Sequence, residues 1–310
     1  MLKAFLLVIV GLAGDPEHGA QFHKWGTALV DASEKVGIAP AQVTYLGDAK
    51  EGGARVTGRA TREEITQAFA TIAKTAAPDD VLYVVLLGHG NYDGSAARFN
   101  LPGPDITASE FNGLLRKVPV RNVVFVNTAS SSGPFIENLS GPGRTIITAT
   151  RSGAEQYTTL FGGYFVEAFA AEAADADKNK RVSMLEAFLY AKGEVTRAYE
   201  REGLLVTEHA MLDDNGDKKG SQDPTPTGAE GKVAAALSLG SAADAAPLPD
   251  DPKLRALILE RRDLERRVEA LRLLKDSLPP AKYAGELERL VTDLALKTRE
   301  IRTLEGDPKP

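Results

Sequence analysis

Two short segments of the sequence carry side chains that could act together as a nucleophile and a base. His89 lies between two glycines in LLGHG, residues 86–90, directly after an apolar run. Three consecutive serines follow another apolar run in FVNTASSSGPF, residues 125–135. A hydroxyl nucleophile beside an imidazole base, with backbone N–H groups of nearby glycines, is the arrangement that acyl-transfer chemistry needs. A lone histidine is more often structural, so this interpretation depends on the fold bringing the two segments together.

The composition limits the classes of function. The chain has 310 residues, of which 43% are hydrophobic and 26% charged, as is typical of a soluble globular protein with one large domain and an appendage. A formal net charge of -6 argues against nucleic acid as the main partner, because phosphate binding needs a basic surface. The absence of cysteine excludes disulfides, thiolate metal sites and a thiol nucleophile. No segment approaches the length of a membrane span.

The N-terminal apolar run AFLLVIVG, residues 4–11, has two interpretations. After Lys3 it could be a signal peptide, or it could be a first buried strand. The strand is favoured because it completes a βαβ unit that would otherwise lack its opening strand. The compartment stays open, including export from a longer precursor.

Five predicted strands alternate with helical segments along the chain: AFLLVIVG, AQVTYLG, DVLYVVLLG, RNVVFVN and RTIITAT. This alternation predicts a mostly parallel sheet with helices on both faces. Ligands and chemistry gather at the carboxyl ends of the strands in such sheets. Because LLGHG and FVNTASSSG end successive strands, we expect His89 and Ser130 to lie near each other.

The C-terminal part differs from the rest. After a predicted final short strand, KVAAALSLG, the run SAADAAPLPDDP is typical of a linker. Leu257, Leu264, Leu271 and Leu278 then recur every seven residues, and a second helix follows LPP. This pattern predicts an antiparallel, coiled-coil-like helical hairpin that could drive self-association. The predicted divisions are an α/β domain at 1–245, a linker at 246–252 and the hairpin at 253–306.

The α/β part resembles the legumain-like branch of the caspase-fold (clan CD) cysteine peptidases and its bacterial relatives. The resemblance covers roughly residues 4–220. It is strongest in LLGHGNYDG, FNLPGPD, FVNTASSSGPF, GRTIITATRSGAEQ, DADKNKRVSMLEAF and TEHAMLDDNGD. It implies a caspase-like three-layer αβα sandwich. It also implies that His89 is the catalytic histidine, that Gly90 supplies an oxyanion-hole N–H, and that Ser130 occupies the position of the nucleophilic cysteine.

The sequence departs from this family at the nucleophile itself. A serine needs a strong, oriented base, whereas a thiol is partly ionised near neutral pH. Asp93 is the only nearby candidate for an orienting acid, and Gly88 stands where legumains carry an acid. We therefore interpret the chain as a pseudo-peptidase that binds a peptide or protein partner and requires no cofactor. The alternatives are an active endopeptidase with a Ser130/His89 dyad, a serine introduced in place of a native cysteine, and a structural protein acting through the hairpin.

The resemblance also suggests a substrate pocket on the segment TATRSGAEQ. In the family, residues after the next strand line the pocket for the substrate side chain, which corresponds to Arg151, Ser152 and Glu155. A solvated loop that begins a helix explains the same residues equally well.

A second motif, DADKNKRVSMLE, has the spacing of a calcium-binding loop. The EF-hand ligand positions fall on Asp175, Asp177, Asn179, the carbonyl of Arg181, Ser183 and Glu186. Lys180 stands where such a loop has glycine. The motif therefore predicts a calcium site, or else an acidic loop that caps a helix starting near Ser183. The later segment DDNGD, with Asp213, Asn215 and Asp217, lacks the final acid of such a loop.

Overall fold

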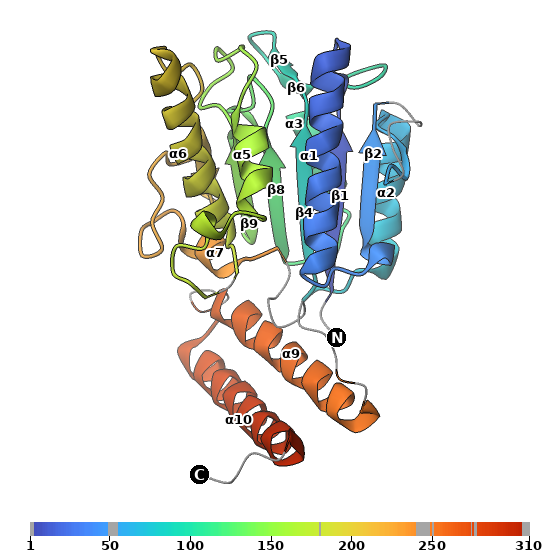
Figure 1. Cartoon of the computed structure of the whole chain (residues 1–310), viewed down its shortest axis with the longest axis vertical. Coiled ribbons are helices and arrows are strands. Elements are labelled where there is room, and N and C mark those ends of the chain that lie inside the picture. Colours follow the sequence, from blue (N-terminus) through green and yellow to red (C-terminus); the bar gives the residue numbers. More distant parts are fainter. Residues whose placement is uncertain are drawn as a thin grey trace. The chain divides into compact units, whose positions relative to one another are not determined.

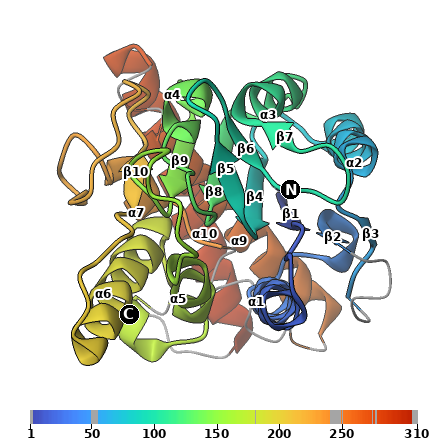
Figure 2. The same ribbon diagram turned by 90° about the horizontal axis from the view of Figure 1, so that it is seen from above.

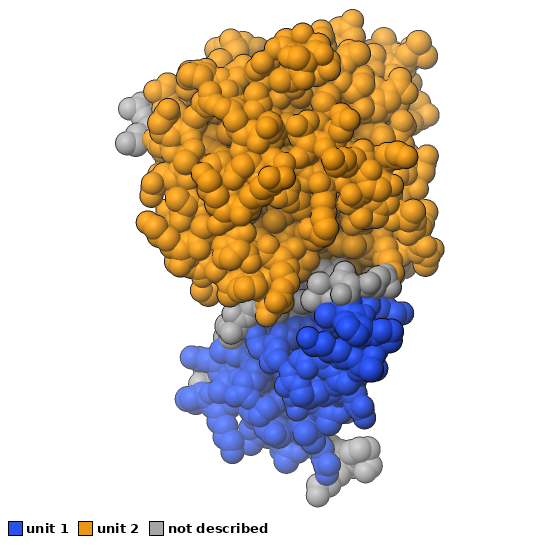
Figure 3. Space-filling model, turned by 180° about the vertical axis from the view of Figure 1, so that it is seen from behind, with its two compact units in different colours: residues 1–2, 240–310 blue, residues 3–239 orange. Residues whose placement is uncertain are grey.

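The computed structural model describes residues 3–48, 55–179, 181–239, 249, 251–273, 275 and 278–305. The chain divides into two compact units, one of residues 3–239 and one of residues 240–310 with the first two residues (Figure 3). Most of the predicted linker at 246–252 lies outside the described residues.

The larger unit is built on a seven-stranded sheet with the order β10-β9-β8-β4-β1-β2-β3. All neighbouring strands are parallel except β10, which pairs antiparallel with β9. The strands are β1 Ala4–Val10, β2 Val43–Gly47, β3 Gly58–Arg59, β4 Val81–Leu87, β8 Asn122–Asn127, β9 Arg144–Thr148 and β10 Met211–Asp213. The central strands β1, β4 and β8 are almost entirely buried. Continuous apolar runs suit strands that are covered on both faces.

Helices cover both faces of this sheet (Figures 1 and 2). α1, α5 and α6 lie on one face, and α2, α3 and α4 lie on the other. The helices of this unit are α1 Pro16–Lys35, α2 Arg62–Thr75, α3 Ala108–Leu115, α4 Phe135–Leu139, α5 Phe161–Ala168, α6 Met184–Glu202 and α7 Lys232–Ala236, with 3₁₀ turns at Pro40–Gln42 and Glu172–Ala174. The predicted three-layer αβα sandwich with a mostly parallel sheet is confirmed.

Polar side chains define where several of these helices begin. Asp15 caps α1 by accepting the His18 N–H, and proline stands at the start of the helix. This combination favours a sharp helix start. Ser183 and Glu186 form a reciprocal capping box at α6. These caps matter for the site, because α1 and the loop before α6 carry candidate functional residues.

Several short elements differ from the sequence-based prediction. The segment KVAAA, predicted as part of a strand, is the helix α7. Asp214 stabilises its start by accepting the N–H groups of Gly231 and Ala234. A second sheet of β5 Gly90–Tyr92, β6 Ala97–Phe99 and β7 Ile106–Thr107 was not predicted. Strands of two or three residues are too short to show a period of two in the sequence.

The smaller unit contains two packed helices, α9 Pro252–Leu273 and α10 Pro280–Glu305. Among the described residues of this unit, a buried apolar cluster contains Leu264, Val268, Leu271 and Leu290. Lys297 of α10 pairs with Glu260 of α9 at 2.9 Å. Among the described helices of the whole chain, none is long and apolar enough to cross a membrane.

Candidate functional site

The sheet brings the segments that carry His89 and Ser130 to the same edge. β4 and β8 are neighbouring parallel strands with Leu86 opposite Asn127, so both segments leave the sheet together. The Gly90 N–H donates to Ser130 Oγ at 3.3 Å, and Ser130 Oγ donates to the Gly90 carbonyl at 3.0 Å. The serine hydroxyl therefore binds the backbone of the residue that follows His89.

This close approach explains the glycine at position 90. A Cβ atom there would lie 2.5 Å from the Ser130 carbonyl oxygen and 2.9 Å from the Arg98 carbonyl oxygen. Such contacts are far inside van der Waals distance. A side chain at position 90 would therefore push the two segments apart.

Residues 128–133, which we call the nucleophile loop, contain a backbone in an unfavourable conformation. Ser131 has a φ of 54°, in the left-handed region that non-glycine residues seldom occupy. Its N–H donates to the Glu155 carbonyl at 2.8 Å, and its hydroxyl donates to the Gly153 carbonyl at 3.0 Å. Residues 149–160, which we call the pocket loop, thus hold the nucleophile loop in place. Strained residues held in this way cluster at functional sites.

His89 is half-buried and packs against α1. The rings of His18 and Phe22 lie 4.9 and 5.1 Å from its ring, both edge to face. Burial lowers the pKa of His89, and the nearby charge of His18 lowers it further. A hydrogen bond to the Ala13 backbone acts in the opposite direction. His89 is consequently an uncharged imidazole at neutral pH.

Asp93, the candidate orienting acid in the sequence, forms its hydrogen bonds within its own turn. One oxygen accepts the Ser95 hydroxyl and the N–H groups of Ser95 and Ala96, and the other accepts Arg98. These hydrogen bonds hold the pKa of Asp93 well below its usual range. Within the part of the chain that the structure describes, no carboxylate hydrogen-bonds to the His89 ring.

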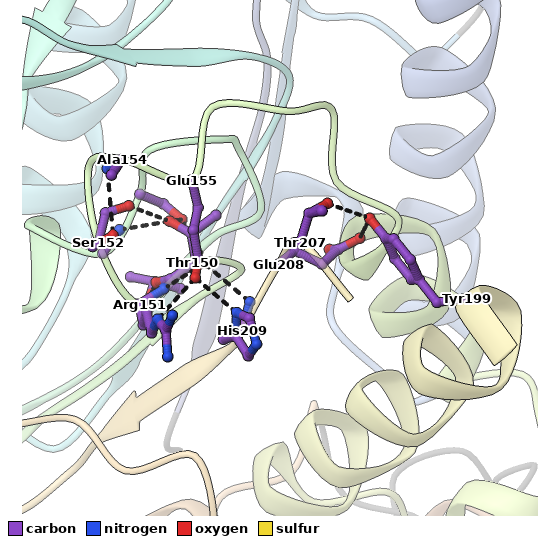
Figure 4. Close-up of polar contacts among 12 residues, drawn as sticks. Thr150, Arg151, Ser152, Ala154, Glu155, Tyr199, Thr207, Glu208 and His209 are labelled. Atoms are coloured by element: carbon purple, nitrogen blue, oxygen red, sulfur yellow. Dashed lines mark hydrogen bonds and ion pairs between the residues drawn. The ribbon is translucent and has the colours of Figure 1, made fainter. Parts of the chain in front are cut away.

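The three predicted pocket residues lie together on the pocket loop (Figure 4). The Glu155 carboxylate, only 11% exposed, pairs with Arg151 Nε at 3.0 Å and with His209 Nδ1 at 2.7 Å. Its second oxygen accepts the backbone N–H groups of Arg151 and His209, each at 3.1 Å. Ser152 Oγ accepts the N–H of Ala154. Glu155 is therefore the centre of a fixed network, which a solvated loop would not provide.

Sequence reasoning gave no role to His209, the partner of Glu155. The two residues are 54 positions apart, and β10 brings them together by pairing with β9. The only signal in the sequence was that the segment TEHAMLDDNGD belonged to the resemblance. That segment contains β10, which was not predicted as a strand.

A cleft of about 480 Å³ adjoins the nucleophile loop and the pocket loop. It is lined by Tyr92, Gly133, Pro134, Ile136, Glu137, Arg151, Ser152, Gly153, Ala154, Met211, Lys218 and Gly220. Two of the three predicted pocket residues, Arg151 and Ser152, are in this lining. The cleft has room for a side chain of a bound peptide.

Glu208 holds the other end of the pocket loop. Its side chain is 5% exposed and accepts the N–H groups of Leu160 and Phe161 at the start of α5, at 2.8 and 3.1 Å. Burial raises the pKa of Glu208 to about 7. Glu208 and His209 are adjacent in sequence, so one short segment holds the pocket loop at two points (Figure 4).

The predicted calcium loop brings three of its acidic side chains together. Oxygen atoms of Asp175, Asp177 and Glu186 lie within 4.8 Å of one another. The Asn179 N–H donates to both aspartates, and the Arg181 N–H donates to Asn179 Oδ1. Glu186 also forms the capping box of α6, so both interpretations of the motif find support. Lys180 lies outside the described residues.

Comparison with known families now adds to this geometry. The model of the peptidase C13 family matches residues 59–213, half of the chain. The chain belongs to the peptidase C13 family. The matched part of this peptidase C13 chain contains His89, Gly90, the nucleophile loop and the pocket loop. This match confirms the resemblance to legumain-like peptidases that the sequence indicated.

One solved structure similar to this peptidase C13 chain is that of protein GSU0716 from Geobacter sulfurreducens. The two chains are 14% identical, with a TM-score of 0.44 over 74% of this chain and 97% of that one. No curated protein matches the chain.

Proposed function

We propose that this peptidase C13 chain is a pseudo-peptidase, which binds a peptide or protein partner in its cleft without cleaving it. The observation that carries the proposal is the pair of hydrogen bonds between the Ser130 hydroxyl and the Gly90 backbone. A serine nucleophile must give its proton to the histidine base as it attacks. Here the hydroxyl proton is directed to the Gly90 carbonyl. The Gly90 N–H, the predicted oxyanion donor, is directed to the hydroxyl.

The electrostatics of His89 support the same proposal. Activation of a serine needs a strong base, usually a histidine oriented by a carboxylate. Burial lowers the pKa of His89, and its hydrogen bond is to the Ala13 backbone. An imidazole with a lowered pKa and no carboxylate partner is a weak base toward a hydroxyl group.

The binding half of the proposal rests on the cleft. Glu155 and His209 fix the pocket loop through partly buried hydrogen bonds. Arg151 and Ser152 line a preformed space beside the nucleophile loop. A chain without peptidase activity can retain such a pocket, because a preformed pocket lowers the entropic cost of binding.

Replacing Ser130 by cysteine tests the proposal. Ser130→Cys supplies a thiol whose ionised form His89 can stabilise. We expect an electrophilic peptide probe to label Ser130→Cys but neither the unmodified protein nor Ser130→Cys/His89→Ala, as measured by intact mass. Ser132→Cys is the matched control, since Ser132 is fully buried and binds Thr150. Labelling of Ser130 in the unmodified protein by a serine-reactive fluorophosphonate would contradict the proposal and support the active endopeptidase.

A further inference from the structure

A second histidine lies beside His89. His18, in the first turn of α1, places its ring 4.9 Å from the His89 ring with an interplanar angle of 69°. Phe22, one turn later on the same face of α1, packs 5.1 Å from His89. Residues four apart share a helix face, so α1 presents both rings to His89 together.

Asp15 fixes the orientation of His18. One oxygen of the Asp15 carboxylate accepts the His18 backbone N–H at 2.9 Å, and the other lies 2.6 Å from His18 Nδ1. These hydrogen bonds lower the pKa of Asp15, so the carboxylate is ionised. An ionised carboxylate only accepts hydrogen bonds, so His18 carries a proton on Nδ1. The cap of α1 thus leaves a carboxylate–imidazole pair next to His89.

We propose that His18, held by Asp15, is a positioning residue that makes His89 a weaker base and so helps to silence the site. This inference rests on the proposed function, because it assigns a cause to the weakness of the dyad. A serine hydroxyl needs a strong histidine base, so a group that opposes the protonation of His89 weakens the dyad. Two positive charges at this distance repel, so protonation of one ring disfavours protonation of the other. In Ser130→Cys the same repulsion would disfavour the imidazolium that stabilises a thiolate.

The charges around His89 are few. Asp15 and His18 act on it from the start of α1, and Asp15 favours the charged form while His18 disfavours it. The effect of His18 is larger than that of Asp15. The chain neighbours of His89 are Gly88 and Gly90, which carry no charge. Among the described ionisable side chains, His18 therefore has the largest effect on the protonation of His89.

A histidine titration by NMR tests the inference on the unmodified protein and on His18→Phe. The phenylalanine keeps an aromatic ring against His89 and removes the charge. We expect the midpoint of the His89 titration to rise by about half a pH unit or more in His18→Phe. His23→Phe is the control, because His23 binds Tyr45 and Asp48, and its replacement should leave the midpoint unchanged. His89→Gln identifies the resonance.

An unchanged His89 midpoint in His18→Phe, or an equal rise in His23→Phe, would overturn the inference. The titration uses no peptide and no cleavage, so it can fail while the proposed function stands. Conversely, peptide cleavage by the unmodified protein would refute the proposed function without altering the titration. A second readout is the labelling of Ser130→Cys by the peptide probe at pH 6, which should be at least twofold faster with His18→Phe added.

Discussion

At the scale of single residues, one atom at position 130 decides the chemistry of the site. A cysteine thiol with an ordinary pKa of about 8.5 is a few per cent ionised near neutral pH. A serine hydroxyl is not ionised and depends wholly on its base. In this chain the proposed base is the half-buried His89, whose pKa is lowered by burial and by His18, and the hydroxyl is hydrogen-bonded to Gly90.

Glu208 gives a prediction at the same scale. The folded chain holds a proton on Glu208 up to a pKa of about 7, whereas an unfolded glutamate has a pKa of about 4.3. The stability linked to this proton is complete below about pH 4 and is lost as the pH rises through about 7. We expect the free energy of unfolding to fall by about 2–4 kcal/mol more in the unmodified protein than in Glu208→Gln between pH 4 and pH 8.

Urea unfolding at several pH values measures this difference. Glu200→Gln is the matched control, because Glu200 is exposed on α6 and its replacement should leave the pH dependence as it is. Parallel stability curves for Glu208→Gln and the unmodified protein would show that Glu208 is ionised in the folded chain.

The sequence could predict only some of these residues. His89 and Ser130 each follow a long apolar strand, and parallel neighbouring strands bring such positions to one edge. His209 and His18 act through contacts with segments far away in the chain, which no local pattern reveals. Asp15 and Pro16 are a strong signal for the start of a helix, but that signal does not show that His18 contacts His89.

At the scale of elements, the loop before α6 remains a predicted calcium site. Three carboxylates share a small volume there, and binding to the folded state raises stability. We expect millimolar calcium to raise the melting temperature by a few degrees, and Asp175→Ala to abolish the rise. Asp79→Ala, an exposed aspartate paired with Arg121, should keep it. An unchanged melting temperature in calcium would leave the loop as a helix cap alone.

Length decides which elements the sequence could predict. The five long strands and the long helices have enough residues to show their burial pattern. β3, β7 and β10 have two or three residues, and their pairing depends on partners far away in sequence. The segment KVAAA gave the wrong prediction because the short apolar run after Lys232 fits a buried strand as well as a helix. The hydrogen bonds that the Asp214 carboxylate accepts from Gly231 and Ala234 favour the helix.

At the scale of the whole molecule, the α/β unit has its own extensive core, and the hairpin has a small one. We expect a chain ending at residue 248 to unfold cooperatively and to stay monomeric, while the full chain self-associates through the hairpin. Light scattering after size exclusion and thermal unfolding measure both properties. Leu290→Asp in the full chain is the matched variant, because Leu290 is 2% exposed in the hairpin core. If the shortened chain fails to fold, the hairpin belongs to the core of the α/β unit.

The most direct test of the pseudo-peptidase proposal is to incubate the unmodified protein with a diverse pool of peptides and to measure retention and cleavage together. We predict that mass spectrometry will find peptides retained intact by the protein. Ala154→Trp, at an exposed position in the lining of the cleft, should reduce this retention. New peptide termini that appear with the unmodified protein and disappear with Ser130→Ala would show that Ser130 is a working nucleophile and would contradict the account.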